Sequence, residues 1–387
     1  MKAVIAIDSF KGSLSSREAG LAVANAIKTV YEDAVCVVRE LADGGEGTVS
    51  AMVSALQGRL CRVAVTGPLG DTVEAEYGVI DETRTAIIEM SAAAGITLID
   101  PLQRDPMYTT TYGVGELLLH AMRQNGCRQF IIGIGGSATN DGGVGMLQAL
   151  GFSFLDEDGC EISRGALGLS KLCKIDCSGA VSELFECEFH IACDVTNPLC
   201  GEWGCSAVYG PQKGATSESV AQMDGWLSHY ADLTAKATGR AFATVPGTGA
   251  AGGMGFAFLS YLKGSLESGI ELIMRETHLE ETLAKADIVI TGEGRLDGQT
   301  CMGKAPVGVA RLAKKYGKPV IAFSGCVTDD ACRCNEQGID AFFPILRTVC
   351  TLEEAMKKEN AVQNLRETAE QAFRLIRCFT SHENATL

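Results

Sequence analysis

Residues 131–145 combine a run of apolar residues with a dense group of glycines and small polar side chains. The segment reads Ile-Ile-Gly-Ile-Gly-Gly-Ser-Ala-Thr-Asn-Asp-Gly-Gly-Val-Gly, which predicts a buried strand, a loop and a helix that starts near Gly143. Glycines let backbone N–H groups approach an anion, hydroxyl groups add donors, and a helix N-terminus supplies positive potential. The sequence therefore favours a phosphate-binding loop over a simple tight turn. Its predicted ligand-binding residues are Gly135, Gly136, Ser137, Ala138, Thr139, Asn140, Asp141, Gly142 and Gly143.

Acidic residues recur in loops that follow predicted strands, most of them beside glycines. Phosphoryl transfer from a nucleotide needs carboxylates for Mg²⁺ and gains from a carboxylate that accepts the hydroxyl proton. Any one such residue is equally well explained as a turn or helix cap. Several such acids at strand ends are less easily explained in that way. They are Asp8, Asp43, Glu46, Asp194, Glu293 and Asp297.

Basic residues lie in similar loops. Lys11 is in Asp-Ser-Phe-Lys-Gly-Ser, Lys213 is in Gly-Pro-Gln-Lys-Gly-Ala, and Arg295 follows Gly-Glu-Gly. Lysines held between glycine or proline neighbours suit phosphate or carboxylate binding, although a solvated loop lysine is the commoner case. Arg104, in Gln-Arg-Asp-Pro, is a further candidate for binding a substrate carboxylate.

Two other functions remain open from the residues alone. Residues 133–138 fit G-x-G-x-x-A, the dinucleotide fingerprint, which would indicate a dehydrogenase that uses NAD. The following Thr-Asn-Asp-Gly-Gly breaks the helix that such a motif should begin, so this match is weak. The third alternative is an anion-binding regulator without catalysis. Only five histidines are present and none lies in a glycine-rich loop, which disfavours histidine-based hydrolysis.

Composition limits the partners. The net charge of −15 disfavours nucleic acid and anionic membrane surfaces. The first apolar run stops at Asp8 without a cleavage site, so it predicts a first buried strand and not a signal peptide. We therefore expect a cytoplasmic protein whose 16 cysteines are reduced thiols.

Both ends of the chain show alternating strands and helices, which predicts a parallel sheet covered by helices. We expect strands near 4–7, 34–38, 287–290, 319–323 and 339–345. A capping box at Ser15–Glu18 predicts the start of the first helix, and residues 291–304 are expected to form a loop. The middle of the chain has a mixed, partly antiparallel pattern. The economical prediction is a doubly wound α/β domain from residues 1–60 and 285–387, with a mixed α/β domain inserted at 61–284.

Taken together, the loops resemble the type-1 glycerate kinase family. The matching segments follow the family's order across almost the whole chain, and the ordered set is far more specific than any one segment. They are residues 8–15 (Asp-Ser-Phe-Lys-Gly-Ser-Leu-Ser), 42–48 (Ala-Asp-Gly-Gly-Glu-Gly-Thr), 66–70, 132–143, 192–199 (Ala-Cys-Asp-Val-Thr-Asn-Pro-Leu), 210–215, 249–255 and 289–297. Two departures are Ile7, where relatives often carry Pro, and Phe10, where they often carry Tyr.

The resemblance implies a flavodoxin-like domain, an inserted domain similar to restriction-enzyme folds, and ATP-dependent conversion of D-glycerate to 2-phosphoglycerate in organic acid use. On this basis the 135–143 loop and Glu293 are expected to bind ATP. Asp194 and Asp297 are expected to bind Mg²⁺. Lys11 and Lys213 are expected to neutralise the transferring group, and Asp43 or Glu46 to orient the substrate hydroxyl. Oligomeric state, monomer or homodimer, is left open.

Overall fold

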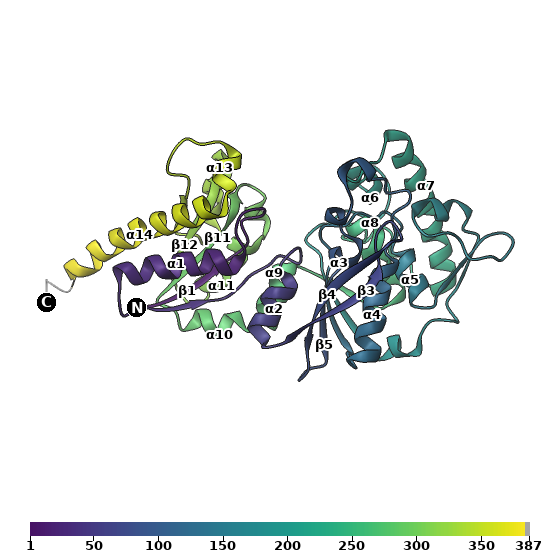
Figure 1. The fold of residues 1–387 in the computed structure, drawn as a ribbon, viewed down its shortest axis with the longest axis horizontal. Coiled ribbons are helices and arrows are strands. Elements are labelled where there is room, and N and C mark those ends of the chain that lie inside the picture. The colour runs from purple at the N-terminus through teal and green to yellow at the C-terminus, as the bar shows by residue number, and fades with distance from the viewer. Residues whose placement is uncertain (384–387) are drawn as a thin grey trace. The chain divides into compact units, whose positions relative to one another are not determined.

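The chain folds into two compact units, described here from a computed structural model that covers residues 1–383 (Figure 1). Unit 1 is formed by residues 1–43 together with the chain from Ile273 onward, and unit 2 is formed by Gly44–Leu272. Unit 2 is therefore inserted, in sequence, between the two segments of unit 1.

Unit 1 contains a five-stranded sheet in the order β13-β12-β11-β1-β2, and all of its neighbouring strands are parallel. Renumbered along the unit, this order is 2-1-3-4-5, the flavodoxin-like doubly wound arrangement. The strands are β1 (Lys2–Ile7), β2 (Val35–Val38), β11 (Ile288–Leu296), β12 (Val320–Val327) and β13 (Ala341–Pro344).

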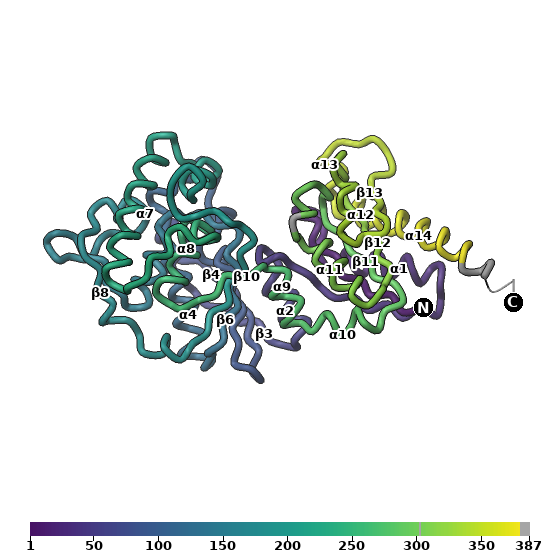
Figure 2. Tube along the Cα trace, turned by 180° about the vertical axis from the view of Figure 1, so that it is seen from behind, coloured from purple at the N-terminus to yellow at the C-terminus, as the bar shows by residue number. Residues whose placement is uncertain are grey.

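Helices cover both faces of this sheet. On one face α1 and α14 lie side by side, and their apolar residues share a core with Ile5, Ile290 and Phe323 (Figure 1). Helix α11 packs on β11 and β1 from the opposite face, seen from behind in Figure 2. The helices are α1 (Ser16–Val30), α10 (Leu279–Ala284), α11 (Ala305–Lys314), α12 (Arg333–Glu336), α13 (Leu352–Met356) and α14 (Lys358–Glu383), with short 3₁₀ turns at η6 (Thr300–Met302) and η7 (Asp329–Cys332).

The predicted capping box begins α1. The Ser15 side chain accepts a hydrogen bond from the Glu18 amide, and the Glu18 side chain accepts one from the Ser15 amide. This reciprocal pair satisfies two amide groups that the first helical turn would otherwise leave without acceptors. It confirms the start of the first helix expected from the sequence.

Unit 2 contains a six-stranded mixed sheet in the order β10-β9-β6-β5-β4-β3. Strands β3, β4 and β5 pair in antiparallel fashion, whereas β5, β6, β9 and β10 are parallel. The strands are β3 (Arg59–Thr66), β4 (Thr72–Ile80), β5 (Thr85–Glu89), β6 (Gln129–Gly133), β9 (Glu188–Ala192) and β10 (Ser265–Glu267). A separate hairpin pairs β7 (Ser153–Leu155) with β8 (Lys174–Asp176).

A large apolar core lies between this sheet and the helices that pack on it, and it includes Tyr77, Phe130, Phe189 and Phe258. On the other face α2 lies close to the sheet, because Gly78 leaves room for the side chain of Val53. The helices are α2 (Thr48–Leu56), α3 (Ser91–Ala94), α4 (Tyr112–Gln124), α5 (Val144–Ala149), α6 (Cys205–Tyr209), α7 (Ser217–Thr238) and α8 (Ala250–Tyr261), with 3₁₀ turns at η1 (Ile96–Leu98), η2 (Pro101–Gln103), η3 (Ala166–Lys171), η4 (Ser182–Glu186) and η5 (Pro211–Lys213). Helix α9 (Gly269–Glu276) spans the division between the units.

Two features differ from the sequence-based expectations. The compact units divide after Asp43 and not near residue 60, because α2 packs against β4 and β5 of unit 2. The expected loop at 291–304 is also wrong in its first half. The chain stays extended to Leu296 because β11 pairs with β12 through Arg295↔Cys326 and Leu296↔Val327, and this pairing outweighs the low strand propensity of its glycines.

Candidate functional site

Predicted site residues in unit 1 gather where the parallel strands end. Asp8 follows β1 directly, and its amide donates to the carbonyl of Gly292 in β11 at 2.9 Å. Glu293 is the next residue of β11. In an open α/β sheet of this order, ligands bind at the carboxyl ends of the two strands where the strand order reverses, which here are β1 and β11.

Asp8 is a buried carboxyl group in a negative environment. Its side chain accepts a hydrogen bond from the Ser9 amide at 2.7 Å, and the residue is only 4% exposed. Burial, together with the nearby charges of Asp43 and Glu293, raises the pKa of Asp8 to about 7. The sequence placed an acid at this strand end, but Asp8 was not among the residues assigned a catalytic role.

Lys11 and Asp43 form an ion pair in the same unit, with 3.1 Å between Lys11 Nζ and Asp43 Oδ2. Gly12 takes a positive φ of 76°, which closes the turn that carries Lys11. Burial acts to lower the pKa of Lys11, but the charges of Asp43, Asp8 and Glu293 outweigh it, so the pKa lies above its ordinary value. These four side chains form a coupled group, which we call the carboxylate–lysine group.

Ser16 fixes the spacing of this group. Its hydroxyl donates to the Ile7 carbonyl at 2.5 Å and accepts from the Leu41 amide at 2.8 Å. The end of β1 and the segment that leads to Asp43 are thereby joined through one buried side chain.

Glu293 and Asp297 hold the loop that follows β11. Thr300 Oγ1 donates to Glu293 Oε1 at 2.5 Å, while Asp297 Oδ1 accepts the amides of Gln299 at 2.9 Å and Thr300 at 3.2 Å. Burial raises the pKa of Glu293. Arg295 Nε lies 3.5 Å from Asp297 Oδ2. Glu293, a member of the carboxylate–lysine group, and Asp297 therefore both lie near the carboxyl end of β11 in unit 1.

In unit 2 the glycine-rich loop follows β6 and packs closely on the 44–48 loop. A Cβ atom at Gly133 would lie 2.2 Å from the Gly44 carbonyl oxygen, and one at Gly44 would lie 2.5 Å from the Ala192 side chain. The glycines at these two positions therefore allow the close approach of two loops and a strand end. Gly135 and Gly136 are exposed, whereas residues 137–143 are buried.

Lys213 lies beneath this loop. It is 2% exposed, and its Nζ donates to Ser137 Oγ at 2.8 Å and to the Thr139 carbonyl at 2.6 Å. Burial lowers the pKa of Lys213 to about 8. Gly214 follows with φ of 99°, in the left-handed region, which lets the chain turn after the lysine. The predicted lysine thus contacts the predicted phosphate loop through that loop's side chain and backbone.

Much of the loop is already hydrogen-bonded inside the protein. The buried Asp141 accepts from the Thr111 amide and hydroxyl, both at 2.8 Å, and from the amides of Gly143 and Gly145. The amides of Ala138 and Gly142 donate to carbonyl oxygens of neighbouring segments. Burial raises the pKa of Asp141 while these hydrogen bonds oppose the rise. Two buried side-chain oxygens, Thr139 Oγ1 and Asn140 Oδ1, have no hydrogen-bond partner.

The remaining predicted acids lie in unit 2. Asp194 follows β9, and its Oδ1 accepts from Ser268 Oγ at 3.1 Å and from the Gly269 amide at 2.9 Å, at the start of α9. Glu46 is exposed on the 44–48 loop. A residue that the sequence analysis missed is Glu89, at the end of β5. Its Oε1 accepts from the Val49 amide at 2.9 Å, in the first turn of α2.

Glu89 supplies a cap that local sequence lacks. The N-cap residue of α2 is Gly47, which has no side chain to accept from the helix amides. Burial raises the pKa of Glu89, opposed by hydrogen bonds from the amides of Val49, Gly47 and Thr48. No local motif could have indicated this contact, because the cap comes from a strand of the sheet.

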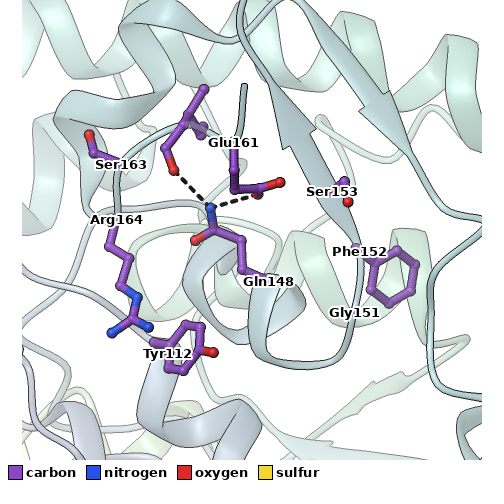
Figure 3. A pocket seen from close by; sticks show the side chains of 9 residues that line it. Tyr112, Gln148, Gly151, Phe152, Ser153, Glu161, Ser163 and Arg164 are labelled. Atoms are coloured by element: carbon purple, nitrogen blue, oxygen red, sulfur yellow. Dashed lines mark hydrogen bonds between the residues drawn. The ribbon is translucent and has the colours of Figure 1, made fainter. Parts of the chain in front are cut away.

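A cavity of about 440 Å³ lies elsewhere in unit 2. Its lining includes Tyr112, Gln148, Phe152, Ser153, Glu161 and Arg164 (Figure 3). The Gln148 amide nitrogen donates to Glu161 Oε1 and to the Ile162 carbonyl. The Arg164 guanidinium stacks 3.4 Å from the centre of the Tyr112 ring. None of the predicted site residues lines this cavity.

The carboxylates of unit 1, Asp8, Glu293 and Asp297, are chemically suited to bind Mg²⁺ that is complexed with a nucleotide. Mg²⁺ prefers oxygen ligands and is usually held by one or two carboxylates together with phosphates and waters. Burial raises the pKa of Asp8 most and the nearby charges of Asp43 and Glu293 add to it, and a divalent cation would relieve that repulsion. Across residues 1–383, no three His, Cys, Asp or Glu side chains come close enough to form a metal site by themselves.

The chain was compared with known proteins. The sequence profile of the glycerate kinase family matches residues 3–377. The chain belongs to the glycerate kinase family. It is 47% identical to a glycerate kinase of Haemophilus influenzae over 97% of this chain and 99% of the relative, and 48% identical to the glycerate 2-kinase of Escherichia coli over 92% and 93%.

A solved structure supports the same assignment. The crystal structure described as glycerate kinase 2 from Salmonella typhimurium LT2 is 48% identical, covers 98% of this chain and 99% of its own, and has a TM-score of 0.88. The predicted fold class and family are confirmed. The chain is thus a phosphotransferase that acts on an alcohol group and uses ATP as co-substrate, which contradicts the dehydrogenase and non-catalytic alternatives.

Two further observations bear on the surroundings of the protein. No helix within residues 1–383 is long and apolar enough to span a membrane. All 16 cysteines are free thiols in the structure.

Proposed function

We propose that this kinase transfers the γ-phosphoryl group of ATP to the 2-hydroxyl of D-glycerate and releases 2-phosphoglycerate. The observation that carries the proposal is the carboxylate–lysine group at the carboxyl ends of β1 and β11, in a chain that is 48% identical to a glycerate 2-kinase. Phosphoryl transfer depends mainly on positioning and on stabilising charge, and this group supplies both.

Within unit 1, we assign Asp8 as the acceptor of the hydroxyl proton. A general base works best when its pKa lies near the working pH, and Asp8 has a pKa of about 7. Lys11, held by Asp43, neutralises charge on the transferring group. Glu293 and Asp297 assist in binding Mg²⁺, which neutralises phosphate charge when bound.

Within unit 2, we propose that the exposed Gly135 and Gly136 approach the ATP phosphates. Ser137 and Thr139 carry hydroxyl groups for the same purpose, and Lys213 fixes their positions from below. The amides of Ala138, Gly142 and Gly143 already donate within the protein, so these residues are proposed to shape the loop.

Further predictions made from the sequence are kept in this proposal. Asp194 remains a predicted Mg²⁺ ligand, and Asp43 or Glu46 a predicted contact of the substrate hydroxyl. We also propose that the enzyme acts in the cytoplasm, because its many thiols are stable in a reducing compartment. We propose that it is a monomer or a homodimer.

A coupled ADP-release assay tests the proposal. Purified protein with ATP and Mg²⁺ is expected to release ADP with D-glycerate and not with glycerol, lactate or L-glycerate. Phosphorus NMR of the product is expected to show the 2-phosphate ester. A 3-phosphate ester would contradict the assigned hydroxyl. The absence of ADP release with every hydroxy acid would contradict the glycerate assignment.

A further inference from the structure

Arg104 is a half-buried cation without a counter-ion. It follows η2 in unit 2, and its Nε atom is buried and has no hydrogen-bond partner. Within residues 1–383, its guanidinium makes no hydrogen bond or ion pair. A guanidinium that is partly removed from water normally has an acceptor, because leaving a buried donor unpaired destabilises the folded protein. The missing acceptor points to a ligand.

The backbone at Arg104 packs against the turn that carries Lys213. The Arg104 carbonyl oxygen would lie 2.0 Å from a Cβ at Gly214, the residue that follows Lys213. A few residues further along the same segment, Thr109 Oγ1 donates to the Ala138 carbonyl at 2.9 Å. Arg104 is therefore held next to the turn that carries Lys213 and to the segment that supports the loop, all within unit 2.

The other basic candidates already have acceptors. Lys11 is paired with Asp43, Lys213 donates to Ser137 and Thr139, and Arg295 lies beside Asp297. Lysine is also a poor match for a planar carboxylate, whereas the two parallel N–H groups of arginine fit its two oxygens. Of these four residues, Arg104 alone is an arginine without an acidic partner.

We propose that Arg104 binds the carboxylate of the hydroxy-acid substrate and so sets the preference of the enzyme for acids over neutral polyols. This inference rests on the proposed function, since it requires an anionic acceptor substrate. In a chain with a net charge of −15, such an anion needs a local cation to overcome the overall repulsion.

Steady-state kinetics of Arg104→Gln and Arg104→Lys test the proposal. For Arg104→Gln the KM for D-glycerate is expected to rise about 10- to 100-fold, because a charge-assisted hydrogen bond to the substrate is lost. The KM for ATP should change less than twofold. Arg104→Lys keeps the charge but not the two parallel N–H donors, so its KM for D-glycerate should lie between those of the wild type and Arg104→Gln. With glyceramide, the neutral amide of the substrate, wild type and variants should have equal kcat/KM.

The matched control is Arg62→Gln, which removes a surface arginine of the same unit that is paired with Glu76 and should leave all constants unchanged. Melting temperatures establish that each variant is folded. A rise in the KM for ATP instead of glycerate would assign Arg104 to phosphate and overturn the proposal, as would an unchanged KM for glycerate. Failure of the wild-type enzyme to phosphorylate glycerate would instead contradict the proposed function.

Discussion

The two regions that carry the predicted ligand-binding residues differ in how their polar groups are satisfied. In unit 1, the carboxylate–lysine group is coupled through its charges, and the pKa of Asp8 lies near 7. In unit 2, residues 137–143 are buried, and Asp141 and Lys213 fix them through hydrogen bonds. Charge determines the state of the first region, whereas hydrogen bonds determine the geometry of the second. The proposed function accordingly assigns proton transfer to unit 1 and positioning to unit 2.

The largest effect is expected at Asp8. Asp8→Asn should lower kcat about 10²- to 10⁴-fold, the usual contribution of a general base. In the wild type, kcat/KM should fall as the pH drops below about 7, because Asp8 then holds a proton. The variant should not show this fall at acidic pH. Steady-state rates between pH 5.5 and 9 measure both. Asp158→Asn, at an exposed turn, serves as the matched control.

Thermal denaturation provides a second check on Asp8. Because the pKa of Asp8 is higher in the folded state than in the unfolded chain, the wild type loses stability as the pH rises from about 4 to about 7. Asp8→Asn should therefore melt above the wild type at pH 8, with a smaller gain at pH 5. A variant that is less stable at pH 8 would show that Asp8 does not have this environment.

Asp194→Asn separates a metal ligand from a helix cap. If Asp194 binds Mg²⁺, its replacement should lower kcat about 10- to 100-fold, and the variant should need more Mg²⁺ to reach its half-maximal rate. If Asp194 only caps α9, the replacement would lower the free energy of unfolding by only about 1 kcal/mol. Rates over a Mg²⁺ titration are the measurement. An unchanged titration curve would remove Asp194 from the catalytic set.

Lys213→Met tests whether Lys213 contributes by holding the 135–143 loop in place for ATP binding. The KM for ATP should rise about tenfold, since Ser137 and Thr139 lose their donor. The melting temperature should change little, because removal of a buried charge offsets part of the lost hydrogen bonding. A fall in kcat as large as that of Asp8→Asn, at unchanged KM, would show that Lys213 acts on the transferring group.

The smallest effect is expected at Glu89. Glu89→Gln removes the carboxylate that caps α2, which should lower the free energy of unfolding by about 1 kcal/mol. Urea denaturation measures it, with Glu82→Gln, an exposed acid in the preceding turn, as the control. A larger loss that is accompanied by a fall in kcat would indicate that the 44–48 loop needs this cap for catalysis.

Local signals predicted much of the fold. The Ser15–Glu18 box gave the start of α1, and the glycine-rich segments gave the loops that follow β1, β6 and β11. The length of β11 could not be predicted, because it depends on pairing with β12. The division between the units also depends on packing, since α2 contacts strands that come later in the chain.

Sequence signals point to candidate site residues, but they do not give the surroundings of these side chains. Residue types and strand ends pointed to Lys11, Asp43, Glu293 and Lys213, all of which have specific contacts in the structure. The unusual pKa of Asp8 could not be read from sequence, because it arises where β1 meets β11 from the distant part of the chain. The burial of Lys213 likewise depends on a loop far from it in sequence.

The order of strands along the chain has a consequence for biosynthesis. β1 and β2 leave the ribosome before the central partner of β1, which is β11 and is translated only after all of Gly44–Leu272. At about 5–20 residues per second, the inserted unit can fold while the open edge of β1 waits for tens of seconds. The nascent segment that holds β1 and β2 therefore lacks its central partner strand throughout that interval.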